Sequence, residues 1–136
     1  GKLQESFAHA LADTDADAFV FDQFSNPSAK EIRERFDKFV DIIRESHPDT
    51  PLIFIQTIRR EKRNFNQAAD EYEAAKQAAG EEMVRARMNK NIWFIDSKGF
   101  LGNDSLGTAD GTHPTDVGFS RILDKLTPRL NKILKR

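Results

Sequence analysis

The amino-acid sequence predicts an α/β fold in which helices cover both faces of an open parallel sheet. Three short apolar runs lack polar alternation, which is typical of strands buried on both faces. Amphipathic helical stretches separate these runs, and strands that alternate with helices pair in parallel through right-handed crossovers. Hydrophobic residues make up 38% and charged residues 32% of the 136 residues, so the chain can form a folded core.

The first half of the chain contributes two helices and two strands. Apolar residues recur at helical spacing near the start, at Leu3, Phe7, Ala10 and Leu11. The run AFVF, residues 18–21, is the first predicted strand, and a polar loop with a Pro follows it. The helical period returns at Ser28, which together with Glu31 three residues later resembles a capping box. The run LIFI, residues 52–55, is the second predicted strand.

The second half contributes two more helices and the third strand. A long Ala-rich helix is predicted over residues 64–88, where Gly80 is expected to bend or interrupt it. The apolar face of that helix is marked by Phe65, Ala68, Tyr72, Ala75 and Ala79. The run IWFI, residues 92–95, is the third predicted strand, with Trp93 in the core. A loop rich in Gly, Asp and Ser leads to a final helix, in which Pro128 is expected to cause a kink.

These elements predict the later part of a domain. A three-stranded sheet is small for a fold with helices on both faces, and the chain opens on a helix that no strand precedes. We therefore expect residues 1–136 to form the C-terminal part of a single domain whose first strands lie upstream. The sequence contains no internal repeat and no low-complexity linker.

Composition argues against several classes of partner and site. The formal net charge is −1, with no long block of one sign, so nucleic acid and anionic membranes are poor candidates for partners. No apolar run approaches the length of a membrane span. The absence of Cys excludes disulfides and thiolate metal sites and leaves the cellular compartment open. The three His lack carboxylates at ligand spacing, so we expect no metal site.

Polar residues follow each predicted strand, and these residues form the candidate site. In an open parallel sheet, ligands bind beyond the carboxyl ends of the strands. Asn26 follows the first strand and Arg59 follows the second. The loop after the third strand carries Asp110 and His113. Because the three strand ends share one edge of the sheet, we expect these residues to converge although they are far apart in the sequence.

Three of these residues are of the types that acyl-transfer chemistry requires. A His acts as a general base when its tautomer is fixed, and a carboxylate such as that of Asp110 can fix the tautomer and stabilise the imidazolium of His113. The amide of Asn26 can donate a hydrogen bond to the oxyanion of a tetrahedral intermediate. A nucleophile remains to be found.

The motif DGTHPTDVGF, residues 110–119, is similar to the last block of the SGNH (GDSL-type) serine hydrolases, and its wording is closest to a bacterial subgroup of GDSL-like acylhydrolases. That block supplies the acid and the base of a Ser-His-Asp triad as Asp-x-x-His. The stretch VFDQFSNP, residues 20–27, resembles the block in which an Asn completes the oxyanion hole. The family often has Gly-x-Asn-Asp there, whereas this chain has FSNP, with Asn26 at the Asn position.

The resemblance implies a flavodoxin-like fold, which is a three-layer α/β/α sandwich, and a serine esterase or acylhydrolase. Under it, His113 is the base, Asp110 orients the base, and Asn26 contributes to the oxyanion hole. The nucleophilic Ser belongs to a Gly-Asp-Ser block upstream, so the chain alone is expected to be inactive. The implied substrate is an acyl or acetyl ester of a carbohydrate or lipid-like alcohol. The resemblance also favours a secreted or periplasmic location and requires no cofactor or metal.

Each candidate residue also has a purely structural interpretation. Asp110 can cap a turn beside a surface His, and Asn26 before a Pro suits an Asx turn or a helix cap. Arg59 is a candidate for substrate contact, but exposed charged residues often serve solubility alone. Ser25 and Ser28 follow the wrong strand for the nucleophile of the family. The alternative function is therefore a non-catalytic α/β binding module or a degenerate hydrolase.

Overall fold

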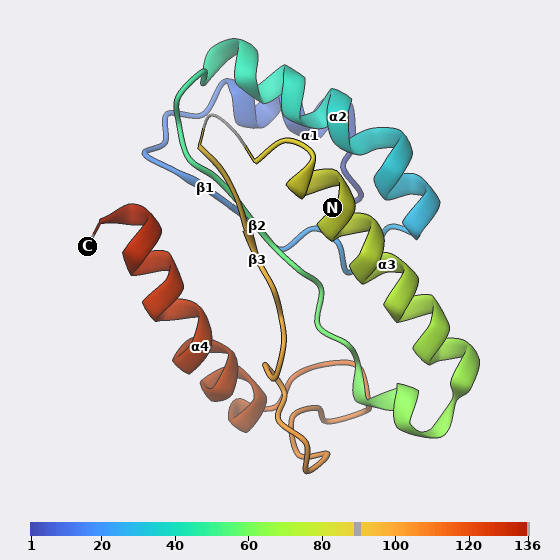
Figure 1. Ribbon diagram of the computed structural model, residues 1–136. Helices are drawn as coiled ribbons and strands as arrows, with labels where there is room; N and C mark the ends of the chain where they lie inside the picture. The colour runs from blue at the N-terminus through green and yellow to red at the C-terminus, as the bar shows by residue number, and fades with distance from the viewer. Residues whose placement is uncertain (89–90, 136) are drawn as a thin grey trace. The chain divides into compact units, whose positions relative to one another are not determined.

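The computed structural model describes residues 1–88 and 91–135 (Figure 1). The elements in chain order are α1 (Glu5–Ala12), β1 (Phe19–Phe21), α2 (Ala29–Ser46), β2 (Leu52–Ile55), the 3-10 helix η1 (Glu61–Phe65), α3 (Gln67–Arg85), β3 (Ile92–Ile95) and α4 (Asp116–Leu134). They form two compact units. The first unit comprises Gly1–Thr57 with Ala75–Asp96, and the second comprises Ile58–Ala74 with Ser97–Arg136. None of the helices in the described residues is long and apolar enough to cross a membrane.

The three predicted strands form one parallel sheet in the order β1-β2-β3. Phe21 of β1 pairs with Phe54 of β2, which in turn pairs with Phe94 of β3. All four residues of β2 are buried, as expected for a central strand. The parallel pairing predicted from the alternation of strands and helices is confirmed. The carboxyl ends of all three strands therefore lie at one edge of the sheet.

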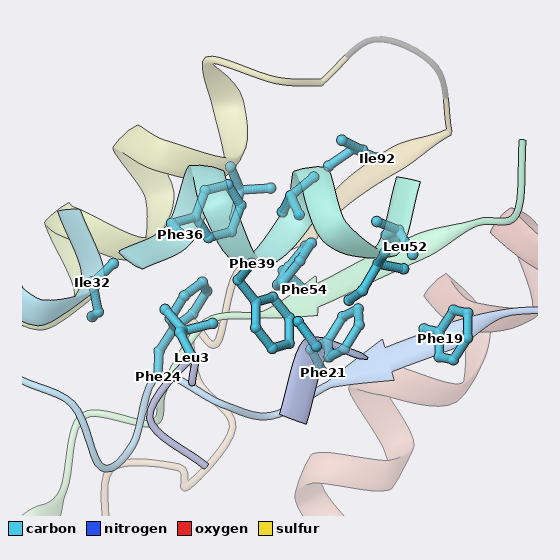
Figure 2. Packing of buried hydrophobic residues seen from close by; sticks show 14 of the residues in the cluster. Leu3, Phe19, Phe21, Phe24, Ile32, Phe36, Phe39, Leu52, Phe54 and Ile92 are labelled. Carbon is cyan, nitrogen blue, oxygen red and sulfur yellow. The ribbon is translucent and has the colours of Figure 1, made fainter. Parts of the chain in front are cut away.

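A cluster of phenylalanine rings fills the core of the first unit between α2 and the sheet (Figure 2). The fully buried ring of Phe54 lies 4.6 Å from that of Phe21 and 5.0 Å from that of Phe36, measured between centroids. Phe39 of α2 meets Phe21 edge-on at 5.6 Å, and Phe24 stacks on Phe54 at 5.9 Å. Such stacked and edge-to-face pairs add to the stabilisation that burial alone provides. The Phe-rich composition therefore serves core packing.

Helix α2 begins at the capping box expected from Ser28 and Glu31. The backbone N–H of Glu31 donates to Ser28 Oγ at 3.2 Å, and the backbone N–H of Ser28 donates to Glu31 Oε2 at 2.8 Å. Two N–H groups that the helix cannot pair internally are thus satisfied. The bond from the Ser28 backbone is the main cause that lowers the pKa of Glu31. The apolar stripe of α2 is buried, at Ile32, Phe36, Phe39, Val40, Ile42 and Ile43.

Helix α3 has the expected position but a different buried face. The expected stripe is exposed at Phe65, Ala68, Tyr72 and Ala75. Ala79 of the expected stripe is buried, and the other buried residues of the helix are Glu73, Lys76, Gly80 and Val84. Arg60 Nη1 donates to Glu73 Oε1 at 2.8 Å, and Lys76 Nζ donates to the carbonyl oxygen of Ser25 at 3.1 Å. The rest of the stripe was assigned wrongly, because hydrogen-bonded charges, rather than most of the alanines, face inward, and burial of charge requires such partners.

Some single residues also differ from expectation. Trp93 is 38% exposed and lies on β3, an outer strand of the three, whereas all four residues of the central strand β2 are buried. Phe7 is 48% exposed, and Ala8 is the buried residue of α1. Helix α3 continues through Gly80 without interruption. Helix α4 continues through Pro128, and the kink expected there stays a prediction.

Replacement of Phe54 by Ala is expected to lower the free energy of unfolding by about 3–5 kcal/mol, because truncation of a buried Phe leaves a cavity. Phe65→Ala is the matched control. Phe65 is 89% exposed, and surface substitutions of this kind change stability by less than about 0.5 kcal/mol. Urea unfolding followed by circular dichroism compares the two variants with the wild type. Equal losses in both variants would contradict the central place of Phe54 in the core.

Candidate active site

The motif DGTHPTDVGF forms a closed turn followed by the start of α4. Thr108 and Pro114 pair in an antiparallel bridge at the base of the turn. The backbone N–H of Ala109 donates to the carbonyl oxygen of His113 at 2.9 Å. Gly111 at the tip has a φ of +77°, which glycine adopts without the strain that a side chain introduces. Local backbone geometry therefore brings the Asp and the His of the motif close together.

The carboxylate of Asp110 holds both the turn and the ring of His113. Its Oδ1 accepts hydrogen bonds from the backbone N–H groups of Thr112, at 2.9 Å, and His113, at 2.8 Å. Its Oδ2 lies 2.7 Å from Nδ1 of His113. A carboxylate beside Nδ1 favours the tautomer protonated there, which leaves Nε2 to accept a proton. The backbone N–H of His113, then its ring, and then the N–H of Thr112 hold the pKa of Asp110 well below its usual range.

Both side chains of this pair are accessible, since that of Asp110 is 55% exposed and that of His113 is 79% exposed. Asp110 was given two interpretations from the sequence, as a cap of a turn and as the residue that orients His113. The same carboxylate fits both. One oxygen serves the turn and the other serves the ring. The pair can therefore exchange a proton with a molecule bound beside it.

The first turn of α4 packs closely on the loop before the motif. The hydroxyl of Thr115, the N-cap of α4, accepts from the N–H of Gly118 at 3.1 Å and donates to the carbonyl oxygen of Leu106 at 2.8 Å. A Cβ on Gly118 would collide with the carbonyl oxygen of Gly107. Only glycine at position 118 allows this approach, so the loop and the helix are held in register.

A cation of α4 fixes the outer part of the same loop. Arg121 donates to the two carboxylate oxygens of Asp104 at 2.7 and 2.6 Å and to the carbonyl oxygen of Leu101 at 2.7 Å. The guanidinium, with the N–H of Leu106, lowers the pKa of Asp104 to about 2. The loop that leads to the motif is thus tied to α4 at several points.

A cavity of about 390 Å³ adjoins Asp110. It is lined by Glu61, Lys62, Phe65, Ser105, Thr108, Ala109, Asp110 and Gly111. Its mixed polar and apolar walls suit a small organic group. Within residues 1–88 and 91–135, no group of three or more His, Asp and Glu side chains is arranged to hold a metal ion.

Asn26 is exposed in the loop that follows β1, in the first unit. The two residues before it anchor this loop. Phe24 is buried against Gly80 of α3, where an added Cβ would lie 3.0 Å from the ring. The carbonyl oxygen of Ser25 accepts a hydrogen bond from Lys76, a residue that is only 1% exposed. The residue expected in the oxyanion hole is therefore held beyond the carboxyl end of β1 by contacts with α3.

Arg59 lies in the second unit, after β2, and is paired with Asp70 of α3. Its Nε and Nη2 donate to the two carboxylate oxygens of Asp70 at 2.8 and 2.7 Å. This two-pronged geometry gives a strong and well-oriented pair. The pairing supports a structural role for Arg59, and its contact with a substrate stays a prediction.

The structure brings Asp110 and His113 together. Asn26 belongs to the other compact unit, so the convergence of all three residues stays a prediction. Two residues that were not selected from the sequence, Glu61 and Lys76, are buried and contact loops that carry the candidates. No pattern in the sequence indicates that they are buried, because a charged residue in a polar segment or on an Ala-rich helix is normally exposed.

The chain is similar to proteins of a known family and to solved structures. Residues 1–131 match the model of the GDSL-like Lipase/Acylhydrolase family. The crystal structure of a protein from Bacteroides ovatus, assigned there as a GDSL-like lipase, is 49% identical with a TM-score of 0.95, over 99% of this chain and 41% of that chain. The salicylyl-acyltransferase SsfX3 from a tetracycline biosynthetic pathway is 22% identical with a TM-score of 0.70, over 97% of this chain and 42% of that chain.

These similarities confirm the predicted fold class, the α/β fold of the SGNH hydrolases with its parallel sheet. The chain spans about two fifths of the length of both solved structures. A comparison with curated protein sequences found no match.

Replacement of Asp110 by Asn is expected to change how stability depends on pH. The folded-state pKa of Asp110 lies below its unfolded value of about 3.9, so the carboxylate stabilises the fold above about pH 4. This contribution is lost as the pH falls through the lower folded value. The wild type should therefore exceed Asp110→Asn in stability near neutral pH, with a gap that narrows in acid. Urea unfolding across the acid range measures the gap, and a gap independent of pH would contradict the prediction.

Proposed function

The chain belongs to the GDSL-like lipase/acylhydrolase family, and we propose that it supplies the acid and the base of a serine esterase or acylhydrolase. The nucleophilic Ser of the intact protein is proposed to precede this chain. The reaction is the hydrolysis of an acyl or acetyl ester through a covalent acyl-enzyme. It uses a Ser-His-Asp triad completed by His113 and Asp110.

In the proposed reaction, Nε2 of His113 takes the proton of the Ser hydroxyl as the Ser oxygen attacks the ester carbonyl. Asp110, which accepts the Nδ1–H bond, stabilises the imidazolium that forms. His113 then gives the proton to the leaving alkoxide. A water molecule, deprotonated by the same ring, releases the acyl group from the Ser in the second half of the reaction.

The observation that carries this proposal is the 2.7 Å contact between Nδ1 of His113 and Oδ2 of Asp110. The contact fixes the tautomer that general-base chemistry needs, and the accessible ring allows Nε2 to reach another group. The backbone bonds to Oδ1 keep the carboxylate ionised, so Asp110 retains the charge that favours an imidazolium.

Asn26 is proposed to donate its side-chain N–H to the oxyanion of the tetrahedral intermediate. Its place beyond the carboxyl end of β1, in a loop anchored by Phe24 and Ser25, supports this role, because an oxyanion donor has to be positioned in advance. Arg59, which follows β2 in the chain, is proposed as a secondary contact with the substrate.

The substrate is proposed to be an ester of a carbohydrate or of a lipid-like alcohol. The cavity beside Asp110, with a volume of about 390 Å³, offers the hydroxyl of Ser105 and the exposed ring of Phe65 to part of such a substrate.

The alternative function is that of a non-catalytic α/β module, in which the turn only stabilises the fold. Reaction with an active-site-directed phosphonate distinguishes the two functions, because only an activated Ser is phosphonylated.

The full-length protein is expected to be labelled by a fluorophosphonate, and His113→Ala is expected to lower the labelling rate by at least about 10³-fold, because the Ser then lacks its base. His9→Ala is the matched control. His9 lies on the exposed side of α1, and its replacement should leave the rate unchanged. Gel fluorescence after timed labelling gives the rates. A folded wild type that takes no label would rule out the enzyme in favour of the binding module.

Asn26→Ala is expected to lower kcat for p-nitrophenyl acetate by about 10²–10³-fold with little change in KM, as loss of one oxyanion donor does in other acyl-transfer enzymes. Steady-state kinetics on the full-length protein measure both constants. Asn26→Asp, which keeps the shape but replaces the N–H donor with a charge, should be at least as slow. A rise in KM at constant kcat would instead assign Asn26 to substrate binding.

A further inference from the structure

The segment after β2 contains a buried carboxylate that the proposed mechanism does not use. Glu61, the first residue of η1, is 9% exposed. Its Oε1 accepts a hydrogen bond from the N–H of Gly107 at 3.1 Å. Its Oε2 accepts from the N–H of Thr108 at 2.9 Å and from the hydroxyl of Thr108 at 2.5 Å. A buried carboxylate is costly unless it accepts several such bonds, and here both oxygens are used.

The donors to Glu61 lie at the base of the turn that carries the acid and the base. Thr108 is the residue that pairs with Pro114 across this turn. The next residue of η1 contacts the tip, because the N–H of Lys62 donates to the carbonyl oxygen of Gly111 at 2.9 Å. The start of η1 therefore binds the turn at both its base and its tip.

The opposite side of the turn base is held by α4. The carbonyl oxygen of Gly107 accepts from the N–H of Thr115 at 3.0 Å, and Gly118 packs against the same carbonyl. A Cβ on Gly107 would lie 2.7 Å from the carbonyl oxygen of Leu101 and 3.1 Å from Oε1 of Glu61. The peptide of Gly107 is thus enclosed between Glu61 and the start of α4, with no space for a side chain.

We propose that Glu61 is a positioning residue for the catalytic pair, an inference that rests on the proposed function. It acts through Thr108 and Gly107 and fixes the base of the turn, so that Oδ2 of Asp110 stays on Nδ1 of His113. A Gln at this position cannot replace the carboxylate. Whichever way its amide is turned, its NH₂ faces a backbone N–H that needs an acceptor. Displacement of a catalytic group by about 1 Å can cost 10²-fold in rate.

The test compares Glu61→Gln with Glu31→Gln in the full-length protein. Glu31 is the matched control, because its carboxylate also accepts bonds from a backbone N–H and a hydroxyl, at the start of α2. Glu61→Gln is expected to lower kcat for p-nitrophenyl acetate and the fluorophosphonate labelling rate by about 10–100-fold, with KM unchanged. Glu31→Gln should lower the thermal midpoint but leave both rates unchanged.

A second pair of variants covers the case in which Glu61→Gln does not fold. Thr108→Val keeps the shape of the side chain and removes only the hydroxyl donor to Glu61, so it should lower kcat by several-fold. Thr108→Ser restores the hydroxyl and should recover most of that rate. If kcat falls when the hydroxyl is removed and recovers when it is restored, whatever the volume of the side chain, the bond to Glu61 is the cause of the lower rate.

Proton NMR provides a readout that needs no activity. The Nδ1–H proton of His113, bonded to Asp110, should give a downfield resonance in the wild type and in Glu31→Gln. The resonance should broaden in folded Glu61→Gln or Thr108→Val, because the turn then loosens and the proton exchanges with water. A variant that is less stable but keeps the turn intact would not broaden the His113 resonance.

The outcomes separate this inference from the proposed function. Folded Glu61→Gln or Thr108→Val with wild-type kcat and an unchanged His113 resonance would overturn the positioning role. Absence of labelling in the wild type would overturn the proposed esterase activity, and with it the catalytic role of Glu61. The resonance would still show in that case whether Glu61 holds the pair. Labelling of the wild type together with loss of rate and resonance in the variants supports both proposals.

Discussion

The candidate site depends on the hydrogen bonds that the carboxylate of Asp110 accepts. One oxygen accepts two backbone N–H groups of the turn, and the other accepts the ring N–H of His113. The first set of bonds fixes the rotamer of Asp110, and this rotamer directs the second oxygen at the ring. Because the acid and the base are only three residues apart, a single turn orients both.

In each unit, a buried polar residue positions a loop that carries a candidate residue. Glu61 and the first turn of α4 hold the base of the turn in the second unit. Lys76 holds the loop that carries Asn26 in the first unit. Each buried charge is compensated by hydrogen bonds to a loop backbone, and such bonds specify one loop conformation more narrowly than apolar packing does. Because the chain belongs to a family of hydrolases, substitutions at Glu61 and Lys76 can test whether these loops serve catalysis.

Helix α3 contributes to both units, and its buried face shows how polar residues connect helices to loops. Glu73 pairs with Arg60 within the second unit, and Lys76 bonds the loop after β1 within the first. The alanines of this helix, which suggested an apolar stripe, are in part exposed. The different faces of an Ala-rich helix bury similar apolar areas, so burial of any one of them gains a similar free energy. The hydrogen-bonded charges therefore decide which face of α3 is buried.

The sequence by itself determined the three strands, their parallel pairing, the capping box at Ser28 and the closeness of Asp110 and His113. These features follow from side-chain periodicity or from contacts between residues a few positions apart, which the local chain specifies. Only the tertiary structure decided that Trp93 is partly exposed and that Glu61 lies buried beneath a turn 46 residues away in the sequence. Burial depends on which elements pack together, and a charged side chain reveals its buried partners only when distant segments meet.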